Sequence, residues 1–215
     1  MREPSVPVKA RWLGRLSYSD AHALMRETLA DRIAGNIPDT LLLCEHDPVY
    51  TLGRTRGAAA NVLDARGVPI IPIERGGDVT FHGPGQLVGY PVFQLPEHRH
   101  DLHGYLRGLE ESLIALLAVH GITGERDDRN TGVWVGGRKI AAIGIACRRW
   151  VTWHGFALNR DVDLGYFHRI NPCGMDSTLV TRMVDHTPAP PPMETLAEEV
   201  SQTITQWWRN WTSPA

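Results

Sequence analysis

Two residues in this sequence combine reactive chemistry with a suggestive setting: a cysteine in a tight turn and a lysine at the start of an apolar run. Cys173 lies between proline and glycine in the run NPCG at positions 171–174, which favours a turn and an exposed thiol. A cysteine attacks as the thiolate, which forms readily when a neighbouring cation or base lowers the pKa of the thiol. We therefore expect Cys173 to be a nucleophile.

Lysine is rare in this chain, which makes its positions informative. Of the 22 basic side chains among 215 residues, only Lys9 and Lys139 are lysine. Lys139 opens the apolar run KIAAIG at positions 139–144. Desolvation lowers the pKa of a lysine, and a lysine, unlike an arginine, then becomes a base near neutral pH. The alternative is codon bias, with Lys139 solvated at a turn. Because Lys139 begins an apolar run, we favour its interpretation as a general base.

A glycine-rich segment, RGGDVTFHGPGQ at positions 75–86, leaves backbone N–H groups uncovered where a ligand can approach. Arg75 adds a fixed cation and His82 a titratable imidazole. The glycine spacing matches neither the dinucleotide fingerprint nor the P-loop, so it does not support a phosphate cradle. Two interpretations stay open, a ligand-binding segment and a set of tight turns between strands.

Other reactive side chains have simpler explanations. Cys44 lies in an apolar run and is expected in the core, whereas the place of Cys147 before two arginines leaves its role open. His98, His100 and His103 lack the further ligands of a zinc site. A polar helix start explains them better, and we expect no metal.

Composition excludes several classes of protein. A net charge of −2 gives no basic field for a nucleic acid, and 42% hydrophobic with 21% charged residues is typical of a globular chain. No apolar run approaches the ~20 residues of a membrane span. The three cysteines form no C-x-x-C pair, so no disulfide framework is indicated. The N-terminal segment lacks the apolar region of a signal peptide, and we expect a cytoplasmic protein.

Hydrophobic periodicity predicts mixed helices and strands. Three helices are expected, at 20–34 with Asp20 as its cap, at 101–120, and at 193–211, where three tryptophans form a packing face. The expected strands are 8–16, 41–44, 68–73, 87–93, 132–135, 139–148 and 151–159, the last two pairing as a hairpin around 149–150. Residues 45–66 are expected to be rich in loops. Without strict βαβ alternation, the chain is predicted to be one α+β domain over 1–215, with a proline-rich spacer at 188–192.

The longest of these motifs resembles a known family. The run RGGDVTFHGPGQLVGYP at positions 75–91 is similar to the signature of the lipoyl/octanoyl transferases of lipoate biosynthesis. The similarity continues through KIAAIG (139–144), GFALN (155–159) and NPCG (171–174), and more weakly through EHDPVYTLGR (45–54). After the cysteine, where the family often has Val-Thr-Ser-Leu, this chain has Val-Thr-Arg-Met, so a role for Arg182 stays open.

The resemblance implies a fold, a reaction and a set of residues. The fold is that of the biotin/lipoate A/B protein ligases, with mixed sheets flanked by helices. The reaction transfers an octanoyl or lipoyl group from octanoyl-acyl carrier protein to a lysine of a lipoyl domain, in 2-oxoacid dehydrogenase complexes or the glycine cleavage H protein, without a cofactor. Cys173 would carry the acyl thioester and Lys139 would be its basic partner. The implied substrate-binding residues are Arg75, Gly76, Gly77, Asp78, Val79, Thr80, Phe81, His82, Ala142, Ile143, Gly144, Gly155, Phe156 and Ala157.

Residue chemistry agrees with this implication. A thioester and an amine form an amide without a nucleotide, and Lys139 can take the thiol proton first and the amine proton later. Backbone N–H groups at Gly76, Gly77 or Gly144 are candidate donors to the oxyanion. Candidate linings for the acyl chain are Phe81, Leu87, Ile143 and Phe156.

Three alternatives remain. The first is an ATP-dependent lipoate ligase on the same fold, which needs no cysteine. The second is a papain-like hydrolase that pairs Cys173 with His82 or His154. The third is a non-catalytic module that binds acyl or lipoyl carriers. Because carrier proteins are acidic, a docking face would use arginines, for which the candidates are Arg54, Arg148, Arg149 and Arg169.

Overall fold

The computed structural model describes residues 7–172 and 175–213, so Cys173 lies outside the described residues. The strands are β1 (Lys9–Leu16), β2 (Thr40–His46), β3 (Val49–Leu52), β4 (Ile70–Pro72), β5 (Val79–His82), β6 (Gln86–Val92), β7 (Gly132–Val135), β8 (Arg138–Arg148) and β9 (Val151–Asn159). The α-helices are α1 (Tyr18–Ala34), α2 (Leu102–Val119) and α3 (Met193–Thr212). Short 3₁₀ helices occur at Ala58–Asn61, Glu97–Arg99, Leu164–Arg169, Ser177–Leu179 and Met183–Asp185.

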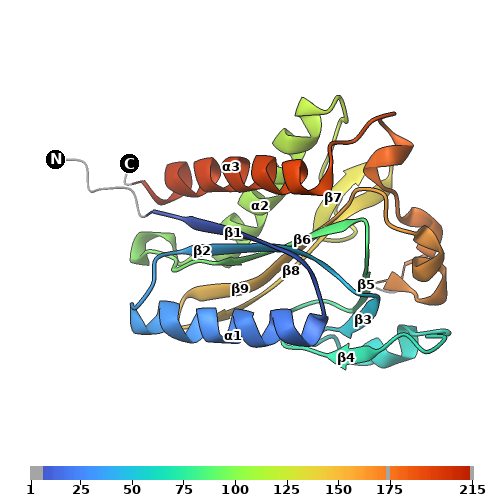
Figure 1. The fold of residues 1–215 in the computed structure, drawn as a ribbon, viewed down its shortest axis with the longest axis horizontal. Coiled ribbons are helices and arrows are strands. Elements are labelled where there is room, and N and C mark those ends of the chain that lie inside the picture. Colours follow the sequence, from blue (N-terminus) through green and yellow to red (C-terminus); the bar gives the residue numbers. More distant parts are fainter. Residues whose placement is uncertain (1–6, 173–174, 214–215) are drawn as a thin grey trace.

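Six strands form the main sheet, in the order β1-β2-β6-β9-β8-β7. β1 and β2 are parallel, and every other neighbouring pair is antiparallel. In Figure 1, α1 lies along one face of this sheet, and α2 and α3 lie along the other. This layered arrangement of mixed sheets and helices confirms the predicted α+β class.

A second sheet of three short strands, in the order β4-β3-β5, lies next to the start of α1 (Figure 1). The sequence prediction was wrong for two of them, because it placed β3 in a loop and β5 among glycine turns. Each has only four residues, beside prolines or glycines, and is formed by pairing with distant chain. The pairing of β5 fixes the centre of the glycine-rich segment as a strand, so this segment is more than a set of turns.

Helix α1 begins with a side-chain cap. The Ser17 hydroxyl accepts a hydrogen bond from the Asp20 N–H at 3.1 Å, so the cap is Ser17 and not Asp20, as the sequence analysis expected. The serine, three residues before Asp20, caps the free N–H groups of a helix that begins at Tyr18, and Asp20 lies in the first turn, where its charge interacts favourably with the helix dipole. Gly35 ends the helix in the left-handed region, with φ of 78°, as predicted.

The predicted hairpin joins β8 and β9. Arg149 and Trp150, the two residues of the turn, have φ of 51° and 59°. Two successive positive φ values are typical of the turn type that matches the twist of antiparallel strands. The hairpin aligns Gly144 with Gly155 and Ile143 with Phe156, which brings two of the resemblance motifs side by side.

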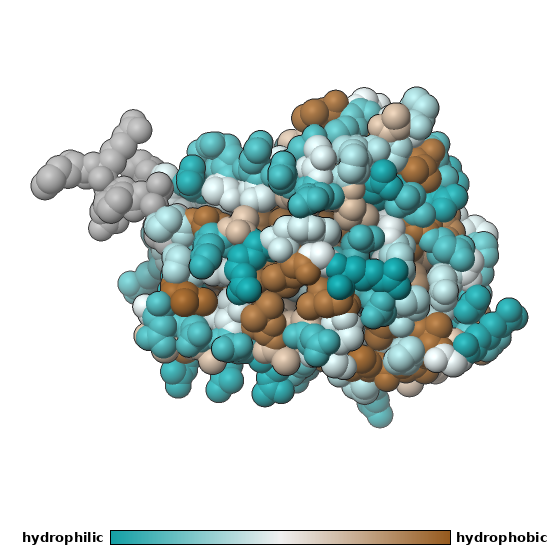
Figure 2. All heavy atoms as spheres, in the orientation of Figure 1, coloured by the Kyte–Doolittle hydropathy of each residue, from teal (hydrophilic) through white to brown (hydrophobic). Residues whose placement is uncertain are grey.

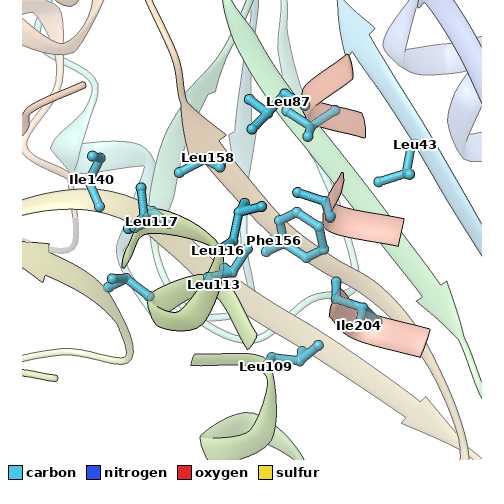
Figure 3. Close-up of a cluster of buried hydrophobic side chains, with 14 of the residues drawn as sticks. Leu43, Leu87, Leu109, Leu113, Leu116, Leu117, Ile140, Phe156, Leu158 and Ile204 are labelled. Atoms are coloured by element: carbon cyan, nitrogen blue, oxygen red, sulfur yellow. The ribbon is translucent and has the colours of Figure 1, made fainter. Parts of the chain in front are cut away.

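The larger core cluster lies between the main sheet and the layer of α2 and α3. Figure 3 shows Leu109, Leu113 and Leu116 of α2 gathered around Phe156 of β9, with Ile204 of α3 nearby. This is the apolar stripe that the sequence predicts for the second helix. Burying each such side chain contributes about 1.5–3 kcal/mol, which anchors the helix layer on the sheet.

The tryptophans of α3 pack as expected. Trp208 is 1% exposed, lies 4.7 Å from the Phe93 ring, and donates through Nε1 to the buried carboxylate of Asp39 at 2.8 Å. Over the face shown in Figure 2, apolar and hydrophilic side chains are interspersed. No α-helix in the described part of the chain is both long and apolar enough to cross a membrane.

Candidate active site

A cavity of about 400 Å³ lies where the glycine-rich segment meets the β8–β9 hairpin. This volume is in the usual range for a small-molecule pocket, roughly 300–1,000 Å³. It is lined by Lys139 and by every expected substrate-binding residue except Phe81: Arg75, Gly76, Gly77, Asp78, Val79, Thr80, His82, Ala142, Ile143, Gly144, Gly155, Phe156 and Ala157. The structure therefore brings together segments that are separated by more than 50 residues in the sequence.

Glycines allow the backbones around the cavity to approach closely. A Cβ on Gly144 would lie 3.0 Å from the Gly76 carbonyl and 3.2 Å from the Arg75 side chain. A Cβ on Gly155 would collide with the Gly89 carbonyl of the neighbouring strand β6. At these two positions a side chain would separate the segments that line the cavity.

Arg75 ties the glycine-rich segment to the second sheet. Its guanidinium donates to the Thr51 carbonyl at 3.0 Å, to the Thr51 hydroxyl at 2.9 Å and to the Gly76 carbonyl at 3.0 Å. Only 9% of the residue is exposed. Arg75 therefore places a fixed positive charge in the cavity wall.

A chain of hydrogen bonds fixes the tautomer of His82. Gln86 Nε2 donates to Asn159 Oδ1 at 2.9 Å, and Asn159 Nδ2 donates to the Thr181 carbonyl at 2.9 Å. Gln86 Oε1 must then accept from His82 Nδ1, 2.7 Å away. His82 thus carries its hydrogen on Nδ1, and Nε2 has a lone pair.

Burial keeps the histidines near the cavity neutral. His46 Nδ1 donates to the Leu16 carbonyl and its Nε2 accepts from the Tyr90 hydroxyl at 2.7 Å. Desolvation lowers the pKa of His46 to about 4, and that of His82 and of His154 to about 3. A papain-like site needs a protonated imidazole beside its thiolate, so these histidines do not favour the hydrolase alternative.

Lys139 is held by the loop before β7. Its Nζ donates to Asn130 Oδ1 at 2.7 Å and to the Thr131 carbonyl at 3.0 Å, and it lies 5.1 Å from the centre of the Trp134 ring. The residue is 7% exposed. The burial of Lys139 contradicts the alternative of a lysine solvated at a turn, because β8 buries the residue and the loop supplies its acceptors.

The segment on either side of Cys173 reaches the same cavity. Pro172 and Met175, the described residues nearest to Cys173, both line the cavity. Thr181, further along, donates its N–H to the Lys139 carbonyl at 2.9 Å, and Val180 pairs with Lys139 as a parallel bridge. The backbone of Lys139 is thus bonded to the strand-like segment that follows the cysteine.

Sequence reasoning missed one residue behind Lys139. Glu110 of α2 is 1% exposed, and its Oε1 accepts from the Gly132 N–H at 3.0 Å. Its Oε2 accepts from Arg107 at 2.9 Å and from Arg126 at 3.1 Å. The signal was present in the sequence, since position 110 lies on the apolar stripe of the predicted helix, where a carboxylate requires partners.

Two residues expected along the acyl chain lie elsewhere. Phe81 stacks on Tyr166 with ring centres 4.4 Å apart, and Leu87 belongs to the core cluster under α2. Neither lines the cavity. Side chains alternate between the two faces of a strand, so Phe81 points away from His82, and Leu87 points away from Gln86, which does line the cavity. Of the four expected linings, Ile143 and Phe156 are present.

The arginines fall into different settings. Arg182 donates to the Val162 carbonyl at 2.9 Å and to Asp185 at 3.2 Å, so it joins two loops. Arg149 lies in the β8–β9 turn with Arg148 beside it, and Arg169 lies over the Tyr166 ring. Arg54 is exposed and donates its N–H to the Arg75 carbonyl at 3.0 Å, which places it nearest the glycine-rich segment among the docking candidates.

The remaining cysteines are not poised for attack. Cys44 is fully buried in β2, and burial raises the pKa of its thiol. This confirms the prediction that Cys44 is a core residue. Burial also raises the pKa of the half-buried Cys147 thiol. Neither thiol forms a thiolate readily, so neither competes with Cys173 as the expected nucleophile.

Comparison with known proteins identifies related sequences over most of the chain. The family model described as the lipoyl protein ligase A/B catalytic domain matches residues 17–205. An octanoyltransferase of Gloeobacter violaceus is 54% identical over 163 residues, which are 75% of this chain and 73% of that protein. An octanoyltransferase of Syntrophotalea carbinolica is 46% identical over 199 residues, 93% of each chain.

Solved structures show the same fold at low sequence identity. The bipartite lipoate protein ligase of Thermoplasma acidophilum superposes with a TM-score of 0.70 at 15% identity, over 94% of this chain and 84% of that one. This likeness confirms the ligase-type fold that the resemblance implies.

Proposed function

Since the chain belongs to the lipoyl protein ligase A/B catalytic-domain family, we propose that it transfers an octanoyl group from octanoyl-acyl carrier protein to a lysine of lipoyl domains. The acceptors are the lipoyl domains of 2-oxoacid dehydrogenase complexes and the glycine cleavage H protein. The observation that carries the proposal is the convergence of Lys139, the glycine-rich segment and the residues flanking Cys173 on one cavity. A free reactive thiol requires a reducing compartment, which favours the cytoplasm.

The reaction proceeds in two steps. In the first, Lys139 takes the thiol proton of Cys173, the thiolate attacks the thioester carbonyl, and the carrier leaves as a thiol that takes the proton back. In the second, the acceptor amine attacks the acyl-enzyme, gives its proton to the Cys173 thiolate by way of Lys139, and forms the amide. The octanoyl chain lies against Ile143 and Phe156. The Gly76 N–H already donates to the Ile145 carbonyl at 2.9 Å, which leaves Gly77 and Gly144 as candidate oxyanion donors.

Glu110 acts in this scheme as a positioning residue. Its carboxylate binds the Gly132 N–H, and Gly132 follows directly on Asn130 and Thr131, whose oxygens accept from Lys139 Nζ. Gly132 has a φ of 145°, and a Cβ there would come within 3.0 Å of Lys139 Cε, so the loop passes against the lysine. Glu110 thus holds the loop that orients the base.

The covalent step is tested with octanoyl-acyl carrier protein alone. We expect intact-mass spectrometry to find one octanoyl adduct on the protein, located on Cys173 by peptide mapping and absent from Cys173→Ser. Cys147→Ser, at a half-buried cysteine outside the cavity, is the matched control and keeps the adduct.

The alternatives give different results in the same assay. An ATP-dependent ligase forms no adduct and modifies a lipoyl domain only with ATP and free acid. A binding module forms neither adduct nor product. Either result would overturn the proposal.

A further inference from the structure

Three side chains outside the proposed catalytic pair converge where α1, β9 and the residue before Arg75 meet. His22 Nε2 lies 3.0 Å from Glu74 Oε2, and His154 Nε2 lies 3.7 Å from the same oxygen. All three ligand atoms lie within 4.8 Å of one another. We propose that His22, Glu74 and His154 bind a divalent transition-metal ion, of which zinc is the expected type. This departs from the expectation that the chain has no metal site.

His154 supplies an independent reason to expect a ligand. Its side chain is 2% exposed, and Nε2 has no hydrogen-bond partner among the described residues. Buried polar atoms are almost always satisfied, so this nitrogen requires an explanation. A metal ion between His154 and Glu74 would be bound by the lone pair of His154 Nε2.

The backbone at His154 is also unusual. The residue has a φ of 56° within strand β9, a conformation that non-glycine residues rarely adopt. The strain occurs at the residue whose Nε2 faces the carboxylate, and strained backbone of this kind collects at functional sites. Its ring stacks on Trp153 with centres 4.4 Å apart and on His22 with centres 6.0 Å apart, so the imidazole is held in a defined orientation.

The donor set selects the class of metal. Two imidazoles and one carboxylate are ligands typical of zinc and its neighbours, whereas magnesium and calcium prefer sites built from oxygen. With metal–ligand bonds of about 2.0–2.2 Å, tetrahedral ligands lie roughly 3.3–3.6 Å apart. The two separations to Glu74 Oε2, 3.0 and 3.7 Å, bracket that range, and the two imidazole nitrogens lie within 4.8 Å of each other, so the ligands would have to draw together around the ion. The fourth position would hold water.

The surrounding charges set the strength of the site. Glu74 directly precedes Arg75 in the chain, so the site combines one carboxylate with a cation close to it. The same Arg75 cation repels a dication, so we expect weaker binding than at a closed structural zinc site.

The test uses tag-free, EDTA-treated protein, titrated with Co²⁺ under visible absorption and with Zn²⁺ in a calorimeter. We expect one equivalent of each ion to bind, with d–d absorption of a four- or five-coordinate cobalt site. At Zn²⁺ about 100-fold above Kd, Tm should rise by about 5–10 °C. His22→Ala and Glu74→Gln should abolish both signals, and His100→Ala, at an exposed histidine that is not part of the cluster, should keep them.

Other outcomes would overturn the site. These are no binding of either ion, binding that survives both His22→Ala and Glu74→Gln, or a thiolate-to-cobalt band that Cys173→Ser removes. Circular dichroism checks that the variants fold. His22 does not line the cavity, so His22→Ala in EDTA should transfer octanoyl groups at the wild-type rate, which separates this proposal from the proposed function.

Discussion

Two walls of the cavity are buried to a similar degree but differ in their polar groups. One contains a lysine amine with several oxygen acceptors, and the other contains neutral imidazoles. The lysine wall consists of Lys139, Asn130 and Thr131, and Glu110 stands behind it. The histidine wall consists of His82 and His154, with His46 behind His82 at a ring distance of 5.8 Å. Oxygen acceptors converge on Nζ of Lys139, whereas His82 and His46 bond to an amide, a carbonyl and a phenol.

This difference suggests separate roles for the two walls in acyl transfer. Desolvation makes the imidazoles neutral, even at His154, which faces the Glu74 carboxylate, so the imidazoles of the histidine wall present no full charge to an acyl chain. Burial with several acceptors keeps a proton-carrying group in a fixed position on the lysine wall. The base should therefore come from the lysine wall, and the histidines should affect stability more than proton transfer.

The strongest test of this division is Lys139→Arg. Arginine keeps the positive charge but cannot give up its proton, so kcat should fall about 10²–10⁴-fold, the usual contribution of general acid–base catalysis. Lys9→Arg, at the exposed lysine of β1, is the matched control and should keep full activity. A Lys139→Arg variant with more than a tenth of wild-type kcat would show that charge alone suffices.

The next test removes the support behind the lysine wall. Glu110→Ala leaves the Gly132 N–H and two arginines without their buried acceptor, so the free energy of unfolding should fall by about 3 kcal/mol and kcat by at least about tenfold. Glu110→Gln can still accept from Gly132 and should recover most of kcat, with KM unchanged. These values come from urea unfolding and steady-state kinetics.

Glu111 provides the control for Glu110. It also bonds Arg126, at 2.6 Å, but its side chain is 61% exposed. Glu111→Gln should change the free energy of unfolding by less than about 0.5 kcal/mol. Equal losses at positions 110 and 111 would mean that Arg126 pairing, and not the buried contact to Gly132, supports the loop.

The histidine wall is tested by pH. Unfolded histidines take up protons near pH 6.5, while folded His46 and His82 do so only near pH 4 and 3, so protons favour the unfolded chain. The stability that these neutral histidines contribute is complete above pH 6.5 and is lost as pH falls from about 6.5 towards 4. Each histidine adds at most about 1.4 kcal/mol per pH unit to this slope.

A substitution measures how much of this pH dependence of the free energy of unfolding comes from His82. In His82→Gln the free energy of unfolding should depend on pH less steeply, by roughly 1 kcal/mol per pH unit between pH 6 and 4. His100→Gln, at an exposed histidine, should leave the slope unchanged. Urea unfolding at a series of pH values measures both, and an unchanged slope in His82→Gln would show that His82 is already protonated in the folded protein.

The two walls also differ in how far sequence could predict them. Lys139 opens a regular strand that the apolar run KIAAIG identifies, and its neighbours follow in the β8–β9 hairpin, which the sequence predicts with nearly correct bounds. The histidine wall is assembled from β2, β5 and β9, and β5 is too short and too close to glycines to be recognised before it pairs with β3. Glu110 was missed because the meaning of a carboxylate on an apolar stripe depends on Gly132, 22 residues away.

The smallest effect is expected at Arg182, a cation that belongs to neither wall. Arg182 occupies the position where the resembling family often has serine, and its side chain is 32% exposed. Its bonds to the Val162 carbonyl and to Asp185 join two loops beside the cavity without entering it. Because solvent screens such a charge, Arg182→Ser should lower the free energy of unfolding by about 0.5–1 kcal/mol and leave kcat/KM within about twofold. Urea unfolding and transfer kinetics measure the two quantities. A large loss of kcat/KM with unchanged stability would instead place Arg182 in carrier binding, so that charge outside both walls also serves the reaction.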